Sequence, residues 1–563
     1  MSTLRRRDLL HAALAASGGV ALGCEPDRPA SIPPFSGPPP RASSSLPEPT
    51  ASASAAPARA PAIVTADTAR PQIPYGVQTG DVTADSAMIW SRSDRPAKMV
   101  VEWSTRDLLA SPIVVPGPIA TPNGDFTARL DLGGLPPGQR IFYRVTFEDL
   151  DTGRTRSEPA LGSFLTAPRL LEGRAAGPTE DVFFLWSGDT AGQGWGINLA
   201  WGGMKIYEAM RRMAPDFFIH CGDLIYADMP IPPEITLPDG SIWTNLTTPE
   251  KSRVAETLAE FRGNFAYNLL DRHVRRFNAE VPSLVMWDDH ETHDNWYPAK
   301  IFDRDRRYTE KRASVLSANG HRAMFEYTPI RPSPVEAGRI YRSFHRGPSL
   351  DVILLDERTY KAPNSDNLQP ARSAATAFLG AAQLGWLEQT LLQSTALWKV
   401  VATDQPLGLV VGDGVRGGVK HFDAWANGKK GPPLGRELEL AELLRFIKQK
   451  RIQNVVWLTA DVHYAAAHHY DPARADFHDF NPFWEFVAGP LHASTYGPNA
   501  LDTTFGPSVK WQSPASGKRR RSPADGAQYF GGVRIDGRTG VMTVRLHDLT
   551  GTKLHEIDIA PSR

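Results

Sequence analysis

Four short apolar stretches of the sequence each end in residues that could bind metal ions. Residues 182–186 are followed by Asp189, residues 217–220 by Asp223 and Tyr226, residues 284–287 by Asp289, His290 and Asn295, and residues 455–459 by Asp461 and His463. Apolar runs rich in β-branched and aromatic types are typical of buried strands, and open α/β sheets place their chemistry beyond the carboxyl ends of the strands. Because several carboxylates buried together are costly unless cations neutralise them, the pattern predicts a metal cluster.

Each of these residues also has a plainer interpretation when taken alone. Asp189 could cap the following helix, Asp223 could be a turn acid, and Tyr226 could simply pack in the core. The run 288–290 could be a solvated loop, and the pair at 461 and 463 is also typical of a capped loop with a surface imidazole. The recurrence of such residues after four separate strands favours the metal site.

The elements that must position these residues alternate in type from about residue 181 onward. We expect strands at 182–186, 217–220, 284–287, 352–355, 400–403, 455–459 and 541–546, and helices at 204–213, 254–277, 304–312, 383–392 and 437–450. Strands that alternate with helices indicate α/β layers. We therefore predict an α/β catalytic domain over 180–563.

The region before residue 180 has a different sequence pattern. Residues 71–168 contain short strand patterns at 86–91, 99–104, 126–132 and 141–147, each bounded by Gly, Pro or Asp. This texture predicts a small β-sandwich that resembles immunoglobulin or fibronectin type III modules. We find no residues suited to chemistry in it and expect a structural or positioning domain.

The N-terminal residues are interpreted as a signal peptide for export. Residues 1–24 contain Arg5-Arg6-Arg7 before a weakly apolar stretch, which resembles a twin-arginine signal; the alternative is a frayed basic terminus. The run 21–24 loosely resembles a lipobox, which would make Cys24 a lipid anchor. Residues 25–70, rich in Pro, Ala and Ser, are expected to be a disordered linker. These features predict the export machinery as a partner and a periplasmic, cell-surface or secreted location.

The composition of the sequence gives no sign of a nucleic-acid-binding, membrane-spanning or disulfide-rich protein. The 563 residues are 41% hydrophobic and 22% charged with a formal net charge of zero, so nothing global suggests a nucleic-acid partner. No apolar run after the N-terminus approaches the roughly 20 residues of a membrane-spanning helix. The only cysteines are Cys24 and Cys221, too few for a disulfide framework. We expect a monomer.

The motif series resembles a known family, the calcineurin-like metallophosphatases, and within it the PhoD-like alkaline phosphatases. The resemblance is carried in order by Gly222-Asp-Leu-Ile-Tyr226, Trp287-Asp-Asp-His-Glu291, Leu355-Asp-Glu-Arg-Thr-Tyr360, Asp404-Gln-Pro-Leu-Gly408 and Thr459-Ala-Asp-Val-His463. It covers about residues 71 to 563. It implies two β-sheets flanked by helices and preceded by a small β-sandwich.

The resemblance also implies a ligand set. One metal ion would be held by Asp189, Asp223, Tyr226 and His463, and a second by Asp223 as a bridge together with Asp289, Asn295 and Asp461. A phenolate ligand favours Fe³⁺, and all-oxygen ligands suit Ca²⁺ or a similar hard divalent ion. Family members with a well-understood iron site have Cys near the first strand end, where this sequence has Asp, so the metal identities stay open.

The expected activity is hydrolysis of phosphate esters. A hydroxide held by two cations would attack phosphorus, and His290 would protonate the leaving alkoxide. Gln193 and His293 are expected to contact substrate, whereas the basic run 518–521 is either a solvated loop or an attractor of phosphate. Two alternatives stay open, namely a phosphodiesterase or phospholipase-type activity at the same centre and a catalytically silent surface-binding protein.

Overall fold

The computed structural model describes residues 66–151, 153, 155–169, 180–516 and 520–562. The predicted export signal, the candidate lipid anchor Cys24 and residues 25–65 of the predicted linker lie outside the described residues. The chain divides after residue 63 into two units, and every described residue belongs to the second.

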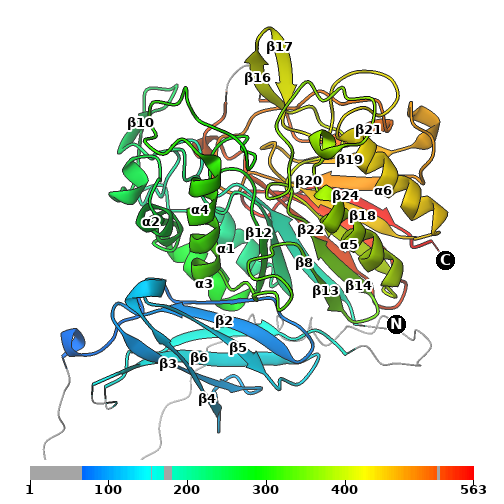
Figure 1. The fold of residues 1–563 in the computed structure, drawn as a ribbon. Helices are drawn as coiled ribbons and strands as arrows, with labels where there is room; N and C mark the ends of the chain where they lie inside the picture. The colour runs from blue at the N-terminus through cyan, green and yellow to red at the C-terminus, as the bar shows by residue number, and fades with distance from the viewer. Residues whose placement is uncertain (1–65, 152, 154, 170–179, 517–519, 563) are drawn as a thin grey trace, which may run out of the picture. The chain divides into compact units, whose positions relative to one another are not determined.

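A nine-stranded and a seven-stranded sheet pack face to face around a shared core, and helices flank them on both sides (Figure 1). In spatial order the first contains β24 (Lys553–Ile559), β23 (Met542–Asp548), β22 (Tyr529–Ile535), β8 (Val182–Ser187), β9 (Phe217–Cys221), β12 (Ser283–Met286), β1 (Val77–Gly80), β2 (Ser86–Arg92) and β5 (Thr127–Gly133). The second contains β13 (Arg342–Arg346), β14 (Leu350–Leu354), β15 (Trp398–Ala402), β18 (Val455–Thr459), β20 (Phe483–Val487), β19 (Ala466–Tyr470) and β21 (Pro507–Gln512). This arrangement confirms the predicted α/β layers.

Strand direction brings the chemistry to one edge of each sheet. β8, β9 and β12 are parallel neighbours in the first sheet, and β14, β15, β18 and β20 are parallel neighbours in the second. Their carboxyl ends therefore share an edge, as in other open α/β sheets.

The seven-stranded sheet is buried on both faces, and its side chains alternate between two cores. Val400 and Leu458 pack in the core between the sheets, whereas Val401 and Trp457 pack in a second core with helices α5 (Gly380–Gln393) and α6 (Glu437–Gln449). Because successive side chains of a strand point to opposite faces, a strand covered on both sides must be apolar throughout. This explains the continuous apolar runs of the sequence.

The helices are α1 (Lys205–Arg212), α2 (Leu258–Asn268), α3 (Arg272–Glu280), α4 (Ala313–Tyr327), α5 (Gly380–Gln393) and α6 (Glu437–Gln449). The single helix predicted over 254–277 is wrong, because Asp271 caps α3 by accepting hydrogen bonds from the backbone N–H groups of His273 and Val274. None of the helices in the described part of the chain is long and apolar enough to cross a membrane.

The charged helix predicted over 304–312 is also wrong. This stretch forms turns, in which Arg307 pairs with Asp305 and Arg312 pairs with Glu310. Residues two apart do not face each other on a helix, so these pairs favour the turn conformation. The helix α4 begins only at Ala313.

The N-terminal strands form a β-sandwich with its own apolar core, and one of its sheets continues the nine-stranded sheet. The four-stranded layer contains β4 (Ile113–Ala120), β3 (Ala97–Ser104), β6 (Arg140–Asp149) and β7 (Ala160–Leu165), and it faces β1, β2 and β5. The strand β1 joins the catalytic sheet by parallel pairing with β12. Two small hairpins, β10 (Glu234–Thr236) with β11 (Ile242–Thr244) and β16 (Gly412–Arg416) with β17 (Val419–Phe422), complete the strands.

Candidate metal centre

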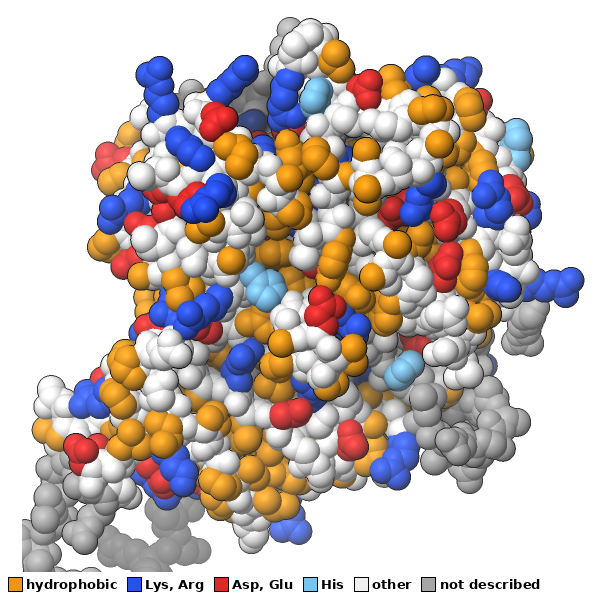
Figure 2. All heavy atoms as spheres, viewed as in Figure 1, with side chains coloured by type: hydrophobic (Ala, Val, Ile, Leu, Met, Phe, Trp, Pro, Cys, Tyr) orange, Lys and Arg blue, Asp and Glu red, His pale blue; other side chains and the backbone are white. Residues whose placement is uncertain are grey.

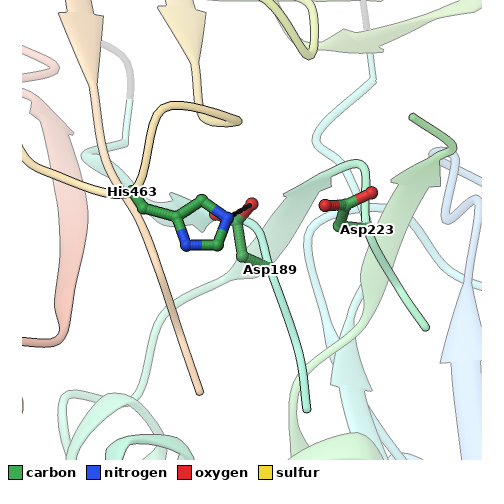
Figure 3. Close-up of side chains that lie close together, drawn as sticks. All are labelled: Asp189, Asp223 and His463. Carbon is green, nitrogen blue, oxygen red and sulfur yellow. Dashed lines mark ion pairs between the residues drawn. The ribbon is translucent and has the colours of Figure 1, made fainter. Parts of the chain in front are cut away.

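Side chains from the ends of β8, β9, β12 and β18 converge between the two sheets. Asp189, Asp223 and His463 form one group whose ligand atoms lie within 4.8 Å of one another, and Asp223, Asp289 and His290 form a second. Figure 3 shows the imidazole of His463 against the carboxylate of Asp189, with Asp223 beside them. Because Asp223 belongs to both groups, it lies where a bridge between two ions would lie.

Two glycines allow the strand ends to approach this closely. A Cβ at Gly188, after β8, would lie 2.8 Å from the Cβ of Ala460, after β18. A Cβ at Gly222, after β9, would lie 2.5 Å from the Cβ of Asp288, after β12. Real Cβ atoms do not tolerate such contacts, so any other residue would force the loops apart.

Five of the predicted ligands adopt a left-handed backbone conformation that non-glycine residues seldom use. Their φ angles are 70° for Asp189, 52° for Asp223, 54° for Asn295, 60° for Asp461 and 58° for His463. Aspartate and asparagine tolerate this region better than other residues, and such strain gathers at functional sites where packing enforces it. The backbone thus turns sharply at each strand end to direct its side chain inward.

The phenol of Tyr226 lies among the first group. Its hydroxyl is 2.9 Å from Nε2 of His463 and 3.4 Å from Oδ1 of Asp189, and Nε2 of His463 is 3.2 Å from the same carboxylate oxygen. The other ring nitrogen of His463, Nδ1, donates to the backbone carbonyl of Ser494 at 2.5 Å, which leaves Nε2 for a ligand. The structure therefore brings Asp189, Asp223, Tyr226 and His463 together.

The remaining predicted ligands lie against the second group. The backbone N–H of Asn295 donates to Oδ2 of Asp289 at 2.5 Å. Burial raises the pKa of Asp461 well above its usual range, and the nearby carboxylates of Asp288 and Asp289 raise it further. The backbone of Asn295 therefore contacts Asp289, and Asp461 lies within electrostatic range of Asp288 and Asp289.

The electrostatics of the cluster call for cations. Burial raises the pKa of Asp223 well above its usual value, and Asp288 and Asp289 raise it further although His290 opposes them. Among the described residues, Oδ2 of Asp189 and Oδ1 of Asp289 are buried without a hydrogen-bond partner. Buried carboxylate oxygens without donors are unfavourable unless an ion binds them, so the donor set fits hard metal ions.

A carboxylate that the sequence analysis overlooked orients His290. Oδ1 of Asp228 lies 2.8 Å from Nδ1 of His290, and Oδ2 accepts the backbone N–H of Asp294 at 2.9 Å. The remaining ring nitrogen, Nε2, lies 3.7 Å from Asp289. Burial alone would lower the pKa of His290, but Asp228, Asp289 and Asp223 outweigh burial and raise it well above its ordinary value.

A fully buried arginine supports the loop of the second group from behind. The guanidinium of Arg358 forms ion pairs with Asp288 and with Asp423, the latter at 2.7 Å, and lies 3.4 Å from Asp404. Glu291 fastens the same loop by accepting the backbone N–H groups of Leu224 at 2.5 Å and Asp288 at 2.9 Å.

The two predicted substrate contacts differ in their surroundings. Oε1 of Gln193 accepts the backbone N–H of Ser494 at 3.0 Å, and the carbonyl of Ser494 accepts from Nδ1 of His463, so Gln193 is linked to the first ligand group through Ser494. Nδ1 of His293 lies 3.0 Å from the carbonyl of Asp294 and Nε2 lies 3.4 Å from Asp305, so both ring nitrogens already have partners.

Three further residues were not assigned to the site from the sequence. Asp228 follows Asp223 in the same loop, and this proximity was the only available signal. Arg358 lies in a stretch that resembled the family, but its burial against Asp288, Asp289, Asp404 and Asp423 cannot be deduced from spacing. Tyr496, whose ring stacks on His463 with centroids 4.5 Å apart, had no sequence signal.

Known proteins share the sequence and the fold of this chain. Residues 184–546 match the family described as PhoD-like phosphatase, and residues 56–168 match the PhoD-like phosphatase N-terminal domain. Alkaline phosphatase D of Bacillus subtilis (strain 168) is 28% identical in an alignment of 452 residues that covers 76% of this chain and 70% of the relative.

Two solved structures share the fold. A structure of PhoD matches with a TM-score of 0.62 and 19% identity, over 87% of this chain and 92% of the other. A purple acid phosphatase from yellow lupin (Lupinus luteus) matches with a TM-score of 0.53 and 12% identity, over 87% and 74%. The chain is therefore a phosphoric ester hydrolase with a metallophosphatase fold, and it belongs to the PhoD-like phosphatase family.

Proposed function

We propose that this protein hydrolyses phosphate esters at a centre of two metal ions that share Asp223. One ion would be held by Asp189, Asp223, Tyr226 and His463, and the other by Asp223, Asp289, Asn295 and Asp461. The observation that carries the proposal is the membership of Asp223 in both ligand groups. The buried carboxylate oxygens without donors support it.

The metals would differ in kind. The phenol of Tyr226 favours a trivalent ion such as Fe³⁺ at the first position, and the carboxylate and amide oxygens at the second favour Ca²⁺. When bound, the cations supply the nucleophilic hydroxide and offset charge on the phosphate oxygens.

Side chains of the protein would supply the proton that the leaving alkoxide needs. Asp228 accepts Nδ1–H of His290 and holds the ring so that Nε2 faces the cluster, where a proton on Nε2 can pass to the leaving alkoxide. Bound cations would offset the charges of Asp223 and Asp289, but Asp228 would still favour the protonated imidazole. Gln193, and less directly His293, would contact the substrate.

An assay with one phosphomonoester and one phosphodiester tests which type of ester the protein hydrolyses. We expect the purified protein to hydrolyse p-nitrophenyl phosphate or bis(p-nitrophenyl) phosphate, and to lose this activity with a chelator. Preference for the second substrate would support the alternative phosphodiesterase or phospholipase-type activity. If the metal-loaded protein cleaves neither ester, a catalytically silent surface-binding protein becomes the better explanation.

Replacement of the shared ligand tests the centre itself. The Asp223→Asn variant should lose both metal ions in elemental analysis, and hydrolysis should fall by at least about a thousandfold, because metal activation of the nucleophile is removed. Metal content and turnover equal to those of the wild type would refute the assignment.

We further propose that the protein is a monomer exported by the twin-arginine route to a periplasmic, cell-surface or secreted location. Residues 1–24 support this proposal by their resemblance to such a signal, and Cys24 would carry a lipid if the run 21–24 acts as a lipobox. Replacement of Arg5 and Arg6 by Lys should leave the protein inside the cell, as fractionation would measure.

A further inference from the structure

An aromatic ring is fixed over the His463 side of the metal centre. The ring of Tyr496 stacks on His463 at 4.5 Å with an interplanar angle of 18°. Three hydrogen bonds fix Ser494, which lies two residues before Tyr496. Nδ1 of His463 donates to the carbonyl of Ser494, and Nε1 of Trp195 donates to the hydroxyl of Ser494 at 2.7 Å. The backbone N–H of Ser494 donates to Gln193. The ring is therefore preorganised over the site.

A cation lies over this ring. The guanidinium carbon of Arg520 is 5.3 Å from the ring centroid of Tyr496, within the range of a cation–π contact. The backbones of Thr495 and Arg521 form a bridge with two hydrogen bonds of 2.9 Å, and this bridge fixes the chain next to Arg520.

The charge of Arg520 is not neutralised by any carboxylate among the described residues, and its side chain is exposed. Figure 2 shows cationic and anionic side chains interspersed over the face in view, and the net charge of the chain is zero. Because the net charge of the chain is zero, a local cation such as Arg520 is suited to attract an anionic group that the metal ions do not bind.

A series of ring contacts links Arg520 to the proposed acid, and His463 and His290 belong to the two different ligand groups that share Asp223. His290 stacks on Tyr226 with centroids 4.3 Å apart, the hydroxyl of Tyr226 contacts His463, and His463 stacks on Tyr496, which carries Arg520. Arg520 and His290 therefore occupy opposite ends of this series.

The surroundings of the acid are mixed in charge. Asp294 is 55% exposed and lies 4.0 Å from Nε2 of His290, and the ammonium of Lys300 donates to the backbone carbonyl of Asp294 at 2.8 Å. Lys300 also lies 4.0 Å from Asp413, so a second anionic group would meet a cation without a described ion-pair partner at Arg520.

We propose that Arg520 determines specificity by binding a second anionic group of the substrate, carried on the part that keeps the phosphate after hydrolysis. The preferred substrates would then be phosphodiesters whose retained alcohol bears a phosphate or a carboxylate. This proposal rests on the proposed phosphoesterase function and on His290 as the group that protonates the leaving alkoxide.

The test uses two diesters with the same leaving group. Carbamoylethyl p-nitrophenyl phosphate and carboxyethyl p-nitrophenyl phosphate are similar in size and differ in the charge of the retained alcohol, and both release p-nitrophenol. The measured quantity is the ratio of their kcat/KM values in the metal-loaded protein. We expect Arg520→Gln to lower the relative preference for the carboxyethyl ester by about fivefold, the size of one partly exposed ion pair.

Two further variants complete the test. Arg520→Lys should retain most of the preference because it keeps the charge, and Arg521→Gln should leave the ratio unchanged. The preference should also shrink with added salt. An unchanged ratio in Arg520→Gln overturns the inference, whereas failure of the metal-loaded wild type to cleave either diester instead overturns the diesterase function on which it rests.

Discussion

The pair formed by Asp228 and His290 gives the sharpest prediction. The carboxylate of Asp228 satisfies two donors at once, Nδ1–H of His290 at 2.8 Å and the backbone N–H of Asp294 at 2.9 Å. An asparagine has one acceptor oxygen, so Asp228→Asn must leave one donor facing an N–H₂ group. The variant therefore loses the charge-assisted bond that orients His290.

The size of the effect follows from that one bond. A buried hydrogen bond to a charged group is worth about 1.5–3 kcal/mol, which corresponds to about a 10- to 150-fold loss of kcat when the bond orients the acid. The loss should be large for an alkyl phosphate, whose alkoxide needs a proton as it leaves. It should be small for p-nitrophenyl phosphate, whose leaving group is already a stable anion.

The assay compares the two esters under saturating metal, with metal content measured in the same samples. Asp351 offers a matched control away from the centre, since it also accepts from a histidine, Nδ1 of His345 at 2.6 Å, and from the hydroxyl of Ser394 at 2.5 Å. Asp351→Asn should lose stability without changing the dependence on leaving group. Equal losses on both esters in Asp228→Asn, with metal retained, would refute the role given to His290.

Two further predictions concern the metal-free state and the approach of the strand ends. The pKa values of Asp223 and Asp461 are raised in the folded protein, so these groups bind more protons when folded than when unfolded, and their contribution to stability falls as the pH rises above about 4. Chelated protein should thus lose Tm relative to metal-loaded protein between about pH 5 and pH 8, and a gap that does not widen would count against a cation-neutralised cluster. Gly188→Ala should lower stability by about 1–3 kcal/mol and weaken metal binding, because the new Cβ meets Ala460 at 2.8 Å. Gly385→Ala, where a Cβ meets nothing within 4 Å, should leave metal content as it is.

The pattern of apolar and polar residues along the sequence was sufficient to predict much of the fold. Apolar runs located β8, β9, β12 and β18 because a strand buried on both faces must be apolar at every position, as the alternation of Val400 and Val401 between two cores illustrates. Periodicity failed where short-range polar contacts decided the backbone. Asp271 ended one helix and began another, and the pairing of Arg307 with Asp305 replaced a predicted helix by turns.

The sequence alone determined which residue types follow each strand, and therefore that Asp189, Asp223, Asp289 and His463 are candidates for a shared site. Only the tertiary structure decided that β18 belongs to a different sheet from β8, β9 and β12, and that Gly188 lets the loop after β18 approach the loop after β8. Only the tertiary structure likewise placed Asp228 behind His290 and Tyr496 over His463. The reason is physical: a strand end fixes the direction of its own side chains, whereas distances between side chains from separate strands depend on how two sheets pack.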